Sequence, residues 1–125
     1  MSSPSPHGLS SPMYLRLIEA FNKPADDAGI LQGVRKFRSG LPHVRVVLSA
    51  SPKNGGKFIP CEGRLEAAFA QALEVDPEVA AYRTQPFSFP GPNGRSLVCD
   101  FAVKWVNYTY SVVDIKPKGH SRCGV

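Results

Sequence analysis

The sequence predicts an α+β domain in which helical segments come first and a small, mixed, mostly antiparallel sheet follows. Apolar residues recur at helical spacing up to Val75, whereas β-branched and aromatic residues dominate the segment from Arg95 to Lys116. The 12 Pro and 11 Gly among 125 residues predict frequent turns. We expect a disordered tail over residues 1–12, a single domain over residues 13–117 and a flexible C-terminus over residues 118–125.

Two N-terminal helices are expected. In the first, over residues 13–21, Leu17 and Phe21 lie four positions apart and share an apolar face. Asp26 and Asp27 are both suited to cap a second helix over residues 28–38, whose apolar residues again recur at helical spacing.

A hairpin and the longest helix form the middle of the chain. Residues 43–49 alternate as a strand does, and Asn54-Gly55 is a strong hairpin signal, so residues 57–59 should pair back. Residues 61–75 are rich in Ala and carry an apolar residue at every fourth position, which predicts a helix.

The rest of the chain is expected to be extended. Short segments over residues 79–83 and 87–89 precede a turn at residues 90–94. A strand over residues 95–104 then pairs antiparallel with a strand over residues 108–116. The result is a three-stranded meander after the long helix.

Charge is divided unevenly along the chain. Residues 1–58 carry eight Lys or Arg and three Asp or Glu, whereas residues 59–125 carry seven of each. A basic half is what holding a phosphate backbone requires, although a solvated basic surface explains the same excess equally well. The candidate nucleic-acid-binding residues are Arg35, Lys36, Arg38, Arg45, Lys53 and Lys57.

The spacing of the cysteines and the length of the apolar runs exclude several classes of protein. The three cysteines, Cys61, Cys99 and Cys123, are widely spaced, which indicates neither a zinc site nor a disulfide framework. No apolar run approaches the roughly 20 residues that span a bilayer, and no signal sequence is recognisable. We expect a cytoplasmic protein without membrane contact.

Carboxylates gather at the ends of the predicted strands. Asp114 and Lys116 are two apart in a strand and point to the same face. If the last two strands are antiparallel neighbours, Asp100 lies toward the same end as Asp114, with room for a divalent cation between them. This geometry indicates phosphodiester hydrolysis. On the long helix, Glu62 and Glu66 are four apart and share a face.

A helix Glu66, a strand Asp100 and then Asp114-x-Lys116 follow the order of the PD-(D/E)xK nuclease superfamily. Five motifs over residues 44–117 resemble the N-terminal catalytic domain of the TnsA endonuclease family, the transposase subunit that cuts the 5′ ends of an element. These motifs are Leu65-Glu66, Leu73-Glu-Val-Asp-Pro-Glu-Val79, Tyr82-Arg-Thr-Gln85-Pro86, Cys99-Asp100-Phe101 and Asp114-Ile-Lys116-Pro117.

The resemblance implies a restriction-endonuclease-like core and an active site that uses Mg²⁺ or Mn²⁺. It implies that Glu66, Asp100 and Asp114 ligate metal and that Lys116 orients the attacking water or steadies the transition state. Carboxylate oxygens suit these hard cations. The same resemblance gives Gln85 a structural role, so Gln85 and Glu62 are expected to support the site. DNA is the expected partner.

The C-terminus departs from the family pattern. Only nine residues follow Lys116, whereas the superfamily core continues with another helix and strand, and the region that binds the transposition ATPase is absent. A second copy or another protein, such as a transposase subunit, is expected to complete the sheet. The alternative is a catalytically silent accessory protein of a phage or mobile element that binds nucleic acid or a protein complex. A third possibility is that the basic N-terminal helices form a helix-turn-helix over Ala25 to Gly40.

Overall fold

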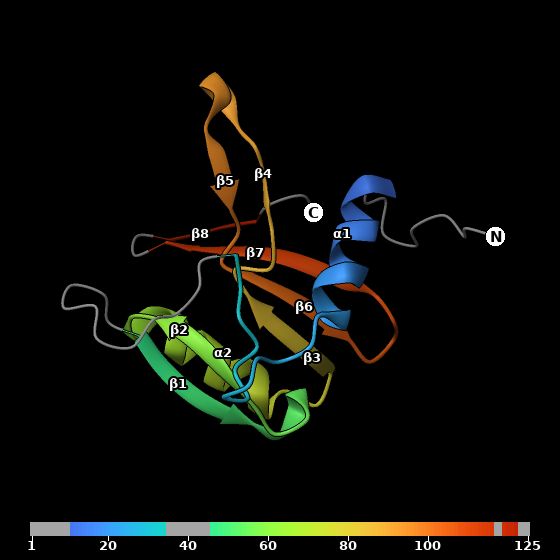
Figure 1. The fold of residues 1–125 in the computed structure, drawn as a ribbon, viewed down its shortest axis with the longest axis vertical. Coiled ribbons are helices and arrows are strands. Elements are labelled where there is room, and N and C mark those ends of the chain that lie inside the picture. Colours follow the sequence, from blue (N-terminus) through green and yellow to red (C-terminus); the bar gives the residue numbers. More distant parts are fainter. Residues whose placement is uncertain (1–10, 35–45, 117–118, 123–125) are drawn as a thin grey trace.

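The computed structural model describes residues 11–34, 46–116 and 119–122, without the side chains of Ser11, Phe89, Lys116 and residues 119–122. These residues form an α+β fold with two helices and small antiparallel sheets (Figure 1). In chain order the elements are α1 Ser11–Asn22, β1 Val46–Ser51, β2 Lys57–Glu62, α2 Arg64–Val75, β3 Val79–Thr84, β4 Ser88–Pro90, β5 Ser96–Val98, β6 Phe101–Trp105, β7 Tyr110–Lys116 and β8 Gly119–Arg122. None of the helices in this part of the chain is both long and apolar enough to cross a membrane.

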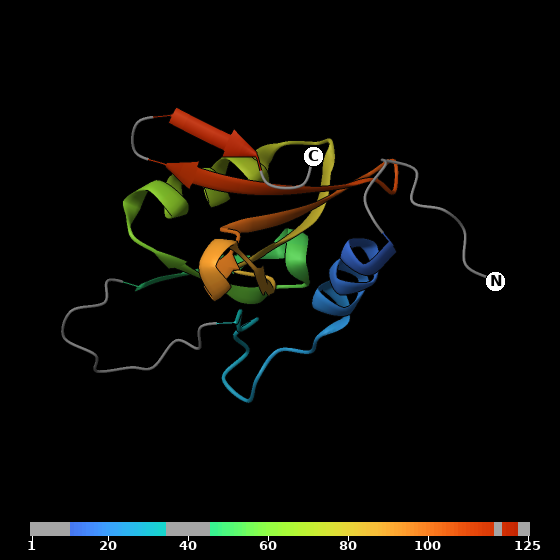
Figure 2. The same ribbon diagram turned by 90° about the horizontal axis from the view of Figure 1, so that it is seen from above.

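A four-stranded antiparallel sheet, in the order β3-β6-β7-β8, is the centre of the fold, and β1-β2 and β4-β5 are separate hairpins. Alternation along β6 divides the core between the two faces of this sheet. Phe101 and Val103 pack in the cluster that contains Leu73 of α2, whereas Ala102 packs in the cluster that contains Leu17 of α1. Figure 2 shows α1 and α2 on different sides of the sheet.

The first predicted helix is confirmed as α1, which is held by one apolar face. Leu17 is fully buried, and the ring of Tyr110 on β7 contacts Tyr14 and Phe21, with ring centroids 5.8 and 5.5 Å apart. These contacts pack α1 against the sheet. Its outer face carries the charged side chains that line a cleft described below.

The second predicted helix, over residues 28–38, is wrong for residues 28–34, which are not helical; residues 35–38 lie outside the described part of the chain. The carboxylate of Asp26 accepts the N–H groups of Ala28 and Ile30, both at 2.9 Å. After this turn the chain is extended and lies beside β2, where the Leu31 N–H donates to the Phe58 carbonyl at 2.9 Å. Burial of Ile30 and Leu31 in this extended form overrides their helical spacing.

The predicted hairpin and long helix are confirmed, with shifted boundaries. β2 runs to Glu62, so the first residues expected in the helix finish a strand instead, and α2 begins at Arg64. Gly63 makes the change of direction with φ of 91°, a left-handed conformation that favours glycine. The turn between β1 and β2 contains a short 3₁₀ helix, Pro52–Asn54, followed by Gly55 with φ of 73°.

The meander is confirmed with two differences. The strand expected over residues 95–104 divides at Cys99 and Asp100 into β5 and β6, and β4-β5 stands out from the body of the molecule (Figure 1). The second difference is that β7 also pairs with β8, a strand that the sequence did not predict. The β7 edge is therefore paired within this chain.

Candidate active site

Asp100 and Asp114 lie at the same end of the β6–β7 pair, as the sequence predicts. β6 and β7 are antiparallel, with Phe101 paired with Val113. Asp100 comes just before β6, and its Oδ2 accepts the backbone N–H of Ile115 at 2.7 Å. One carboxylate is thereby fixed beside the segment that carries the other, and both residues are half-buried.

Glu66 lies in the first turn of α2, and its carboxylate contacts the last residue of β2. Gly63 has no side chain to cap the helix, and Glu66 Oε1 accepts the Glu62 N–H at 3.0 Å. An acidic group in a first turn is favoured by the helix dipole. The same contact brings the backbone of Glu62 against the carboxylate of Glu66.

Gln85 joins this helix end to the strand end that carries Asp100. Its Nε2 donates to Glu62 Oε1 at 2.9 Å, its N–H donates to the Asp100 carbonyl at 2.8 Å, and its carbonyl accepts the Val34 N–H at 2.8 Å. Gln85 is only 5% exposed and has φ of 45°, unusual for a residue other than glycine. A residue strained in this way persists only when its surroundings fix it on several sides.

Hydrogen bonds therefore link the candidate residues in one series, from Glu66 through Glu62 and Gln85 to Asp100 and the neighbour of Asp114. The donor chemistry suits a hard divalent cation, which prefers oxygen ligands. Within residues 11–34, 46–116 and 119–122, however, no group of three or more His, Cys, Asp or Glu side chains is placed to hold a metal ion. The three-ligand metal site thus stays a prediction.

Burial shapes the chemistry of the groups nearest this series. Cys61, at the end of β2, is fully buried, and burial together with the charge of Glu66 raises the pKa of its thiol to about 12. A thiol with such a pKa stays protonated near neutral pH and is a poor nucleophile. Cys61 and Cys99 are packing residues in the two core clusters, and Cys123 lies outside the described residues.

The structure describes two of the basic residues predicted to bind nucleic acid, Lys53 and Lys57. Lys53 Nζ donates to the carbonyls of Asp76 and Val79, at 2.5 and 2.8 Å, so its ammonium fastens the β1–β2 turn to the end of α2. Lys57 is exposed at the start of β2, and its contact with nucleic acid stays a prediction. The side chain of Lys116 and the predicted residues Arg35, Lys36, Arg38 and Arg45 lie outside what the structure describes.

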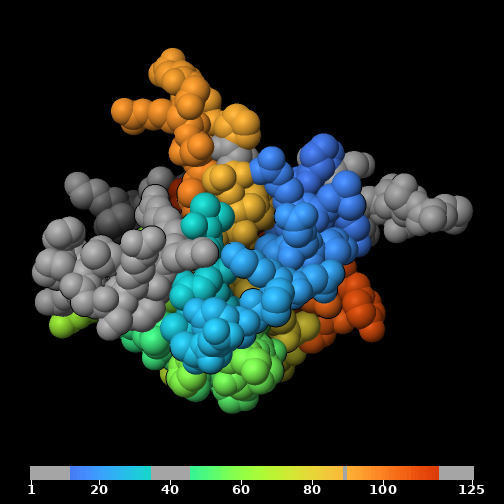
Figure 3. All heavy atoms as spheres, in the orientation of Figure 1, coloured from blue at the N-terminus to red at the C-terminus, as the bar shows by residue number. Residues whose placement is uncertain are grey.

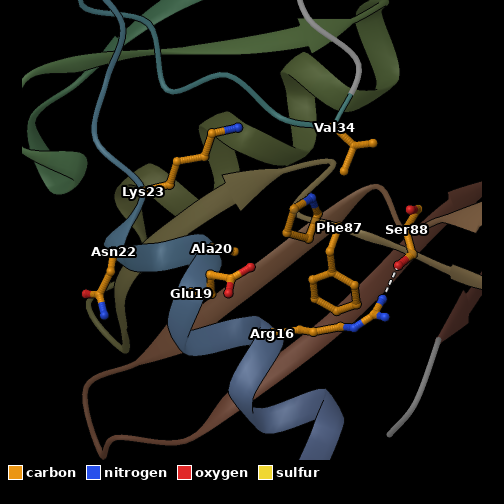
Figure 4. Close-up of a pocket in the computed structure, with 9 residues that line it drawn as sticks. Arg16, Glu19, Ala20, Asn22, Lys23, Val34, Phe87 and Ser88 are labelled. Carbon is orange, nitrogen blue, oxygen red and sulfur yellow. Dashed lines mark hydrogen bonds between the residues drawn. The ribbon is translucent and has the colours of Figure 1, made fainter.

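A cleft beside this site had no counterpart in the sequence predictions. It has a volume of about 840 Å³ and lies between α1 and the segment that follows Gln85. We call it the α1 cleft; its lining residues are Arg16, Glu19, Ala20, Asn22, Lys23, Val34, Pro86, Phe87 and Ser88 (Figure 4). The spacing of Arg16, Glu19 and Lys23 on one helical face was visible in the sequence, but nothing indicated the opposite wall.

Figure 3 shows residues 28–34, in cyan, running beside α1, in blue, below the β4-β5 hairpin, in orange. In the close-up, Arg16 and Glu19 extend from α1 toward Phe87 and Ser88, and Val34 lies on the other side (Figure 4). Arg16 Nη1 donates to the Ser88 carbonyl, which holds the guanidinium at the rim of the cleft.

No family model, no curated protein and no solved structure matches this chain, so the site must be interpreted from its own geometry.

Proposed function

We propose that this protein is a metal-dependent DNA endonuclease of TnsA-like type that hydrolyses phosphodiester bonds. The observation that supports this most is the placement of Asp100 against the Asp114–Lys116 end of β7, through the 2.7 Å hydrogen bond from Ile115. The order of α2, β3, β6 and β7 accords with a restriction-endonuclease-like core. Action within a transposition or mobile-element complex in the cytoplasm belongs to the same proposal.

Asp100 and Asp114 are the residues that would hold Mg²⁺ or Mn²⁺, and Glu66 is linked to Asp100 through Glu62 and Gln85. Mg²⁺ is commonly bound by one or two carboxylates, with waters and substrate phosphate oxygens completing its shell. When bound, the metal polarises the phosphate and lowers the pKa of a coordinated water. Two carboxylates are therefore sufficient for this mode of binding, in which DNA supplies further ligands.

The remaining residues have positioning or electrostatic roles in this proposal. Gln85 fixes Glu62 on one side and the Asp100 backbone on the other. Lys116 supplies positive charge where negative charge develops on the phosphoryl group. The proposal thus assigns the chemistry to the Asp100–Asp114 end of the sheet and its support to the end of β2 and the start of α2.

Nicking of supercoiled DNA in the presence of Mg²⁺ or Mn²⁺ tests the proposal. We expect wild-type protein to nick the plasmid, and Asp100→Asn to slow nicking by roughly 100-fold or more, because the neutral amide loses the charge that attracts the metal. Asp27→Asn, which removes an exposed carboxylate on another segment, is the matched control and should retain the wild-type rate. Equal nicking by Asp100→Asn and wild type would rule out this active site.

The second candidate function is that of a catalytically silent nuclease-fold protein that binds nucleic acid or a protein complex. It is favoured by the finding that no group of three metal-binding side chains is assembled among the described residues. In this case wild-type protein would bind DNA without nicking it in either metal. A steep loss of DNA affinity with added salt would indicate phosphate contacts, whereas a flat response would indicate a protein partner.

A further inference from the structure

We propose that the α1 cleft binds one unpaired nucleotide of a nucleic-acid strand whose neighbouring phosphates lie at the candidate active site. The choice of nucleic acid as the ligand rests on the proposed function. The cleft itself is independent of Asp100 and Asp114, because its lining comes from α1, the adjoining Lys23, Val34 and residues 86–88.

Size and continuity support a ligand here. The volume of about 840 Å³ is within the range of roughly 300–1,000 Å³ that small-molecule sites occupy, so a nucleotide fits. The wall formed by Val34 and Pro86 adjoins Gln85, whose backbone contacts Asp100 and Val34. A strand seated in the cleft therefore lies next to the end of the sheet where the carboxylates gather.

The polar lining suits a nucleotide better than a bare phosphate. Arg16 and Lys23 are exposed cations at the rim and suit phosphate oxygens, with the Arg16 guanidinium already held by the Ser88 carbonyl. Glu19 is also exposed and would repel a phosphate placed against it, but a carboxylate accepts hydrogen bonds from the N–H groups of a base edge.

The apolar lining suits the face of a base. Val34 is 45% exposed, and Pro86 is half-buried beside the buried Phe87. A base laid against the apolar wall formed by Val34 and Pro86 can turn its edge toward Glu19. In a duplex this edge is already paired, so the cleft should favour a strand with an unpaired nucleotide.

A pair of valine substitutions tests the inference. Val34→Asp places a negative charge on the wall of the cleft, whereas Val47→Asp places the same charge on β1, where Val47 is 42% exposed. Binding of a fluorescent single-stranded oligonucleotide is measured by anisotropy in EDTA, so that cleavage plays no part. We expect Val34→Asp to weaken binding by about tenfold or more and Val47→Asp by about twofold or less.

Salt dependence provides a second measurement. Lys23→Gln should reduce the slope of log affinity against log salt by about 0.7, the value for one phosphate contact to a single strand. Thermal unfolding checks that each variant remains folded. Equal losses in Val34→Asp and Val47→Asp, or no loss in either, would overturn the inference. Equal affinity for a free mononucleotide and the oligonucleotide would overturn the assignment to a strand.

The proposed function and this inference fail separately. If wild-type protein nicks DNA but the two valine variants bind the oligonucleotide equally well, the endonuclease proposal stands and the cleft is not part of its substrate site. If only Val34→Asp loses oligonucleotide binding and wild-type protein does not nick DNA, the cleft still binds the strand but the endonuclease proposal is overturned.

Discussion

Glu74 is the carboxylate that fastens the β1–β2 turn to α2. It accepts hydrogen bonds from Ser51 Oγ at 2.6 Å, from Tyr82 OH at 2.7 Å and from the Lys53 N–H at 3.0 Å. Burial by itself raises the pKa of this carboxyl, but the hydrogen bonds from Ser51, Tyr82 and Lys53 together outweigh burial and lower the pKa. These contacts give Glu74 a structural role.

The lowered pKa makes this contribution to stability depend on pH. It is fully present above the ordinary value of 4.5 and is lost as pH falls through the lower folded-state pKa. Glu74→Gln should lower the free energy of unfolding by about 1 kcal/mol at pH 7, measured by urea denaturation, because Glu74 is only half-buried. The difference from wild type should shrink in acid, where the wild-type carboxyl is protonated.

The exposed Glu78 offers a matched control, since Glu78→Gln should leave the unfolding free energy nearly unchanged at both pH values. A Glu74→Gln deficit that is as large in acid as at neutral pH would contradict the role assigned to the charge.

At the scale of elements, the extended segment over residues 28–34 holds β2 and the Gln85 turn together. It pairs with Phe58 on one side, and the Val34 N–H donates to the Gln85 carbonyl. Gly33 permits this approach, because a Cβ there would lie 2.6 Å from the Thr84 carbonyl oxygen and 2.7 Å from that of Gln85. Such contacts with backbone atoms cannot be relieved by rotating a side chain.

Gly33→Ala should therefore be costly. We expect it to lower the free energy of unfolding by about 1–3 kcal/mol, because the whole segment must move away from Gln85. Gly91→Ala is the comparison. Its Cβ would meet the Leu97 side chain at 2.6 Å, but that side chain is 42% exposed and can turn away, and the nearest backbone atom, the Arg95 carbonyl oxygen, is farther off at 3.0 Å. Urea denaturation of both variants measures the difference, and a smaller loss for Gly33→Ala than for Gly91→Ala would contradict this packing.

At the scale of the whole molecule, local signals predicted most elements, and long-range contacts decided the rest. The hairpin at Asn54-Gly55, the helix ending at Val75 and the β6–β7 pair followed from residue type and spacing. Residues 28–34 have helical spacing, but pairing with Phe58 makes them extended. Spacing alone could not indicate β8, nor the division of the predicted strand at Cys99, whose side chain packs in the cluster that contains Leu17.

Part of the candidate site also followed from local signals, and part depends on long-range packing. Antiparallel pairing alone predicted that Asp100 lies near Asp114, because both are close to one end of neighbouring strands. The bond between Gln85 and Glu62 joins residues 23 apart in the sequence and depends on how α2 and β2 pack against the sheet, which spacing does not specify. The α1 cleft likewise needs two walls brought together by the fold.

Binding of Mn²⁺, followed by electron paramagnetic resonance as loss of the free-ion signal, tests most directly whether Asp100 and Asp114 act as one metal site. We predict that wild-type protein binds Mn²⁺, that binding tightens when uncleavable DNA is added, and that Asp100→Asn and Asp114→Asn each weaken binding by roughly tenfold or more. The double variant should be little worse than either single variant, because both changes remove the same site. Equal Mn²⁺ binding by wild type and the double variant would contradict the account.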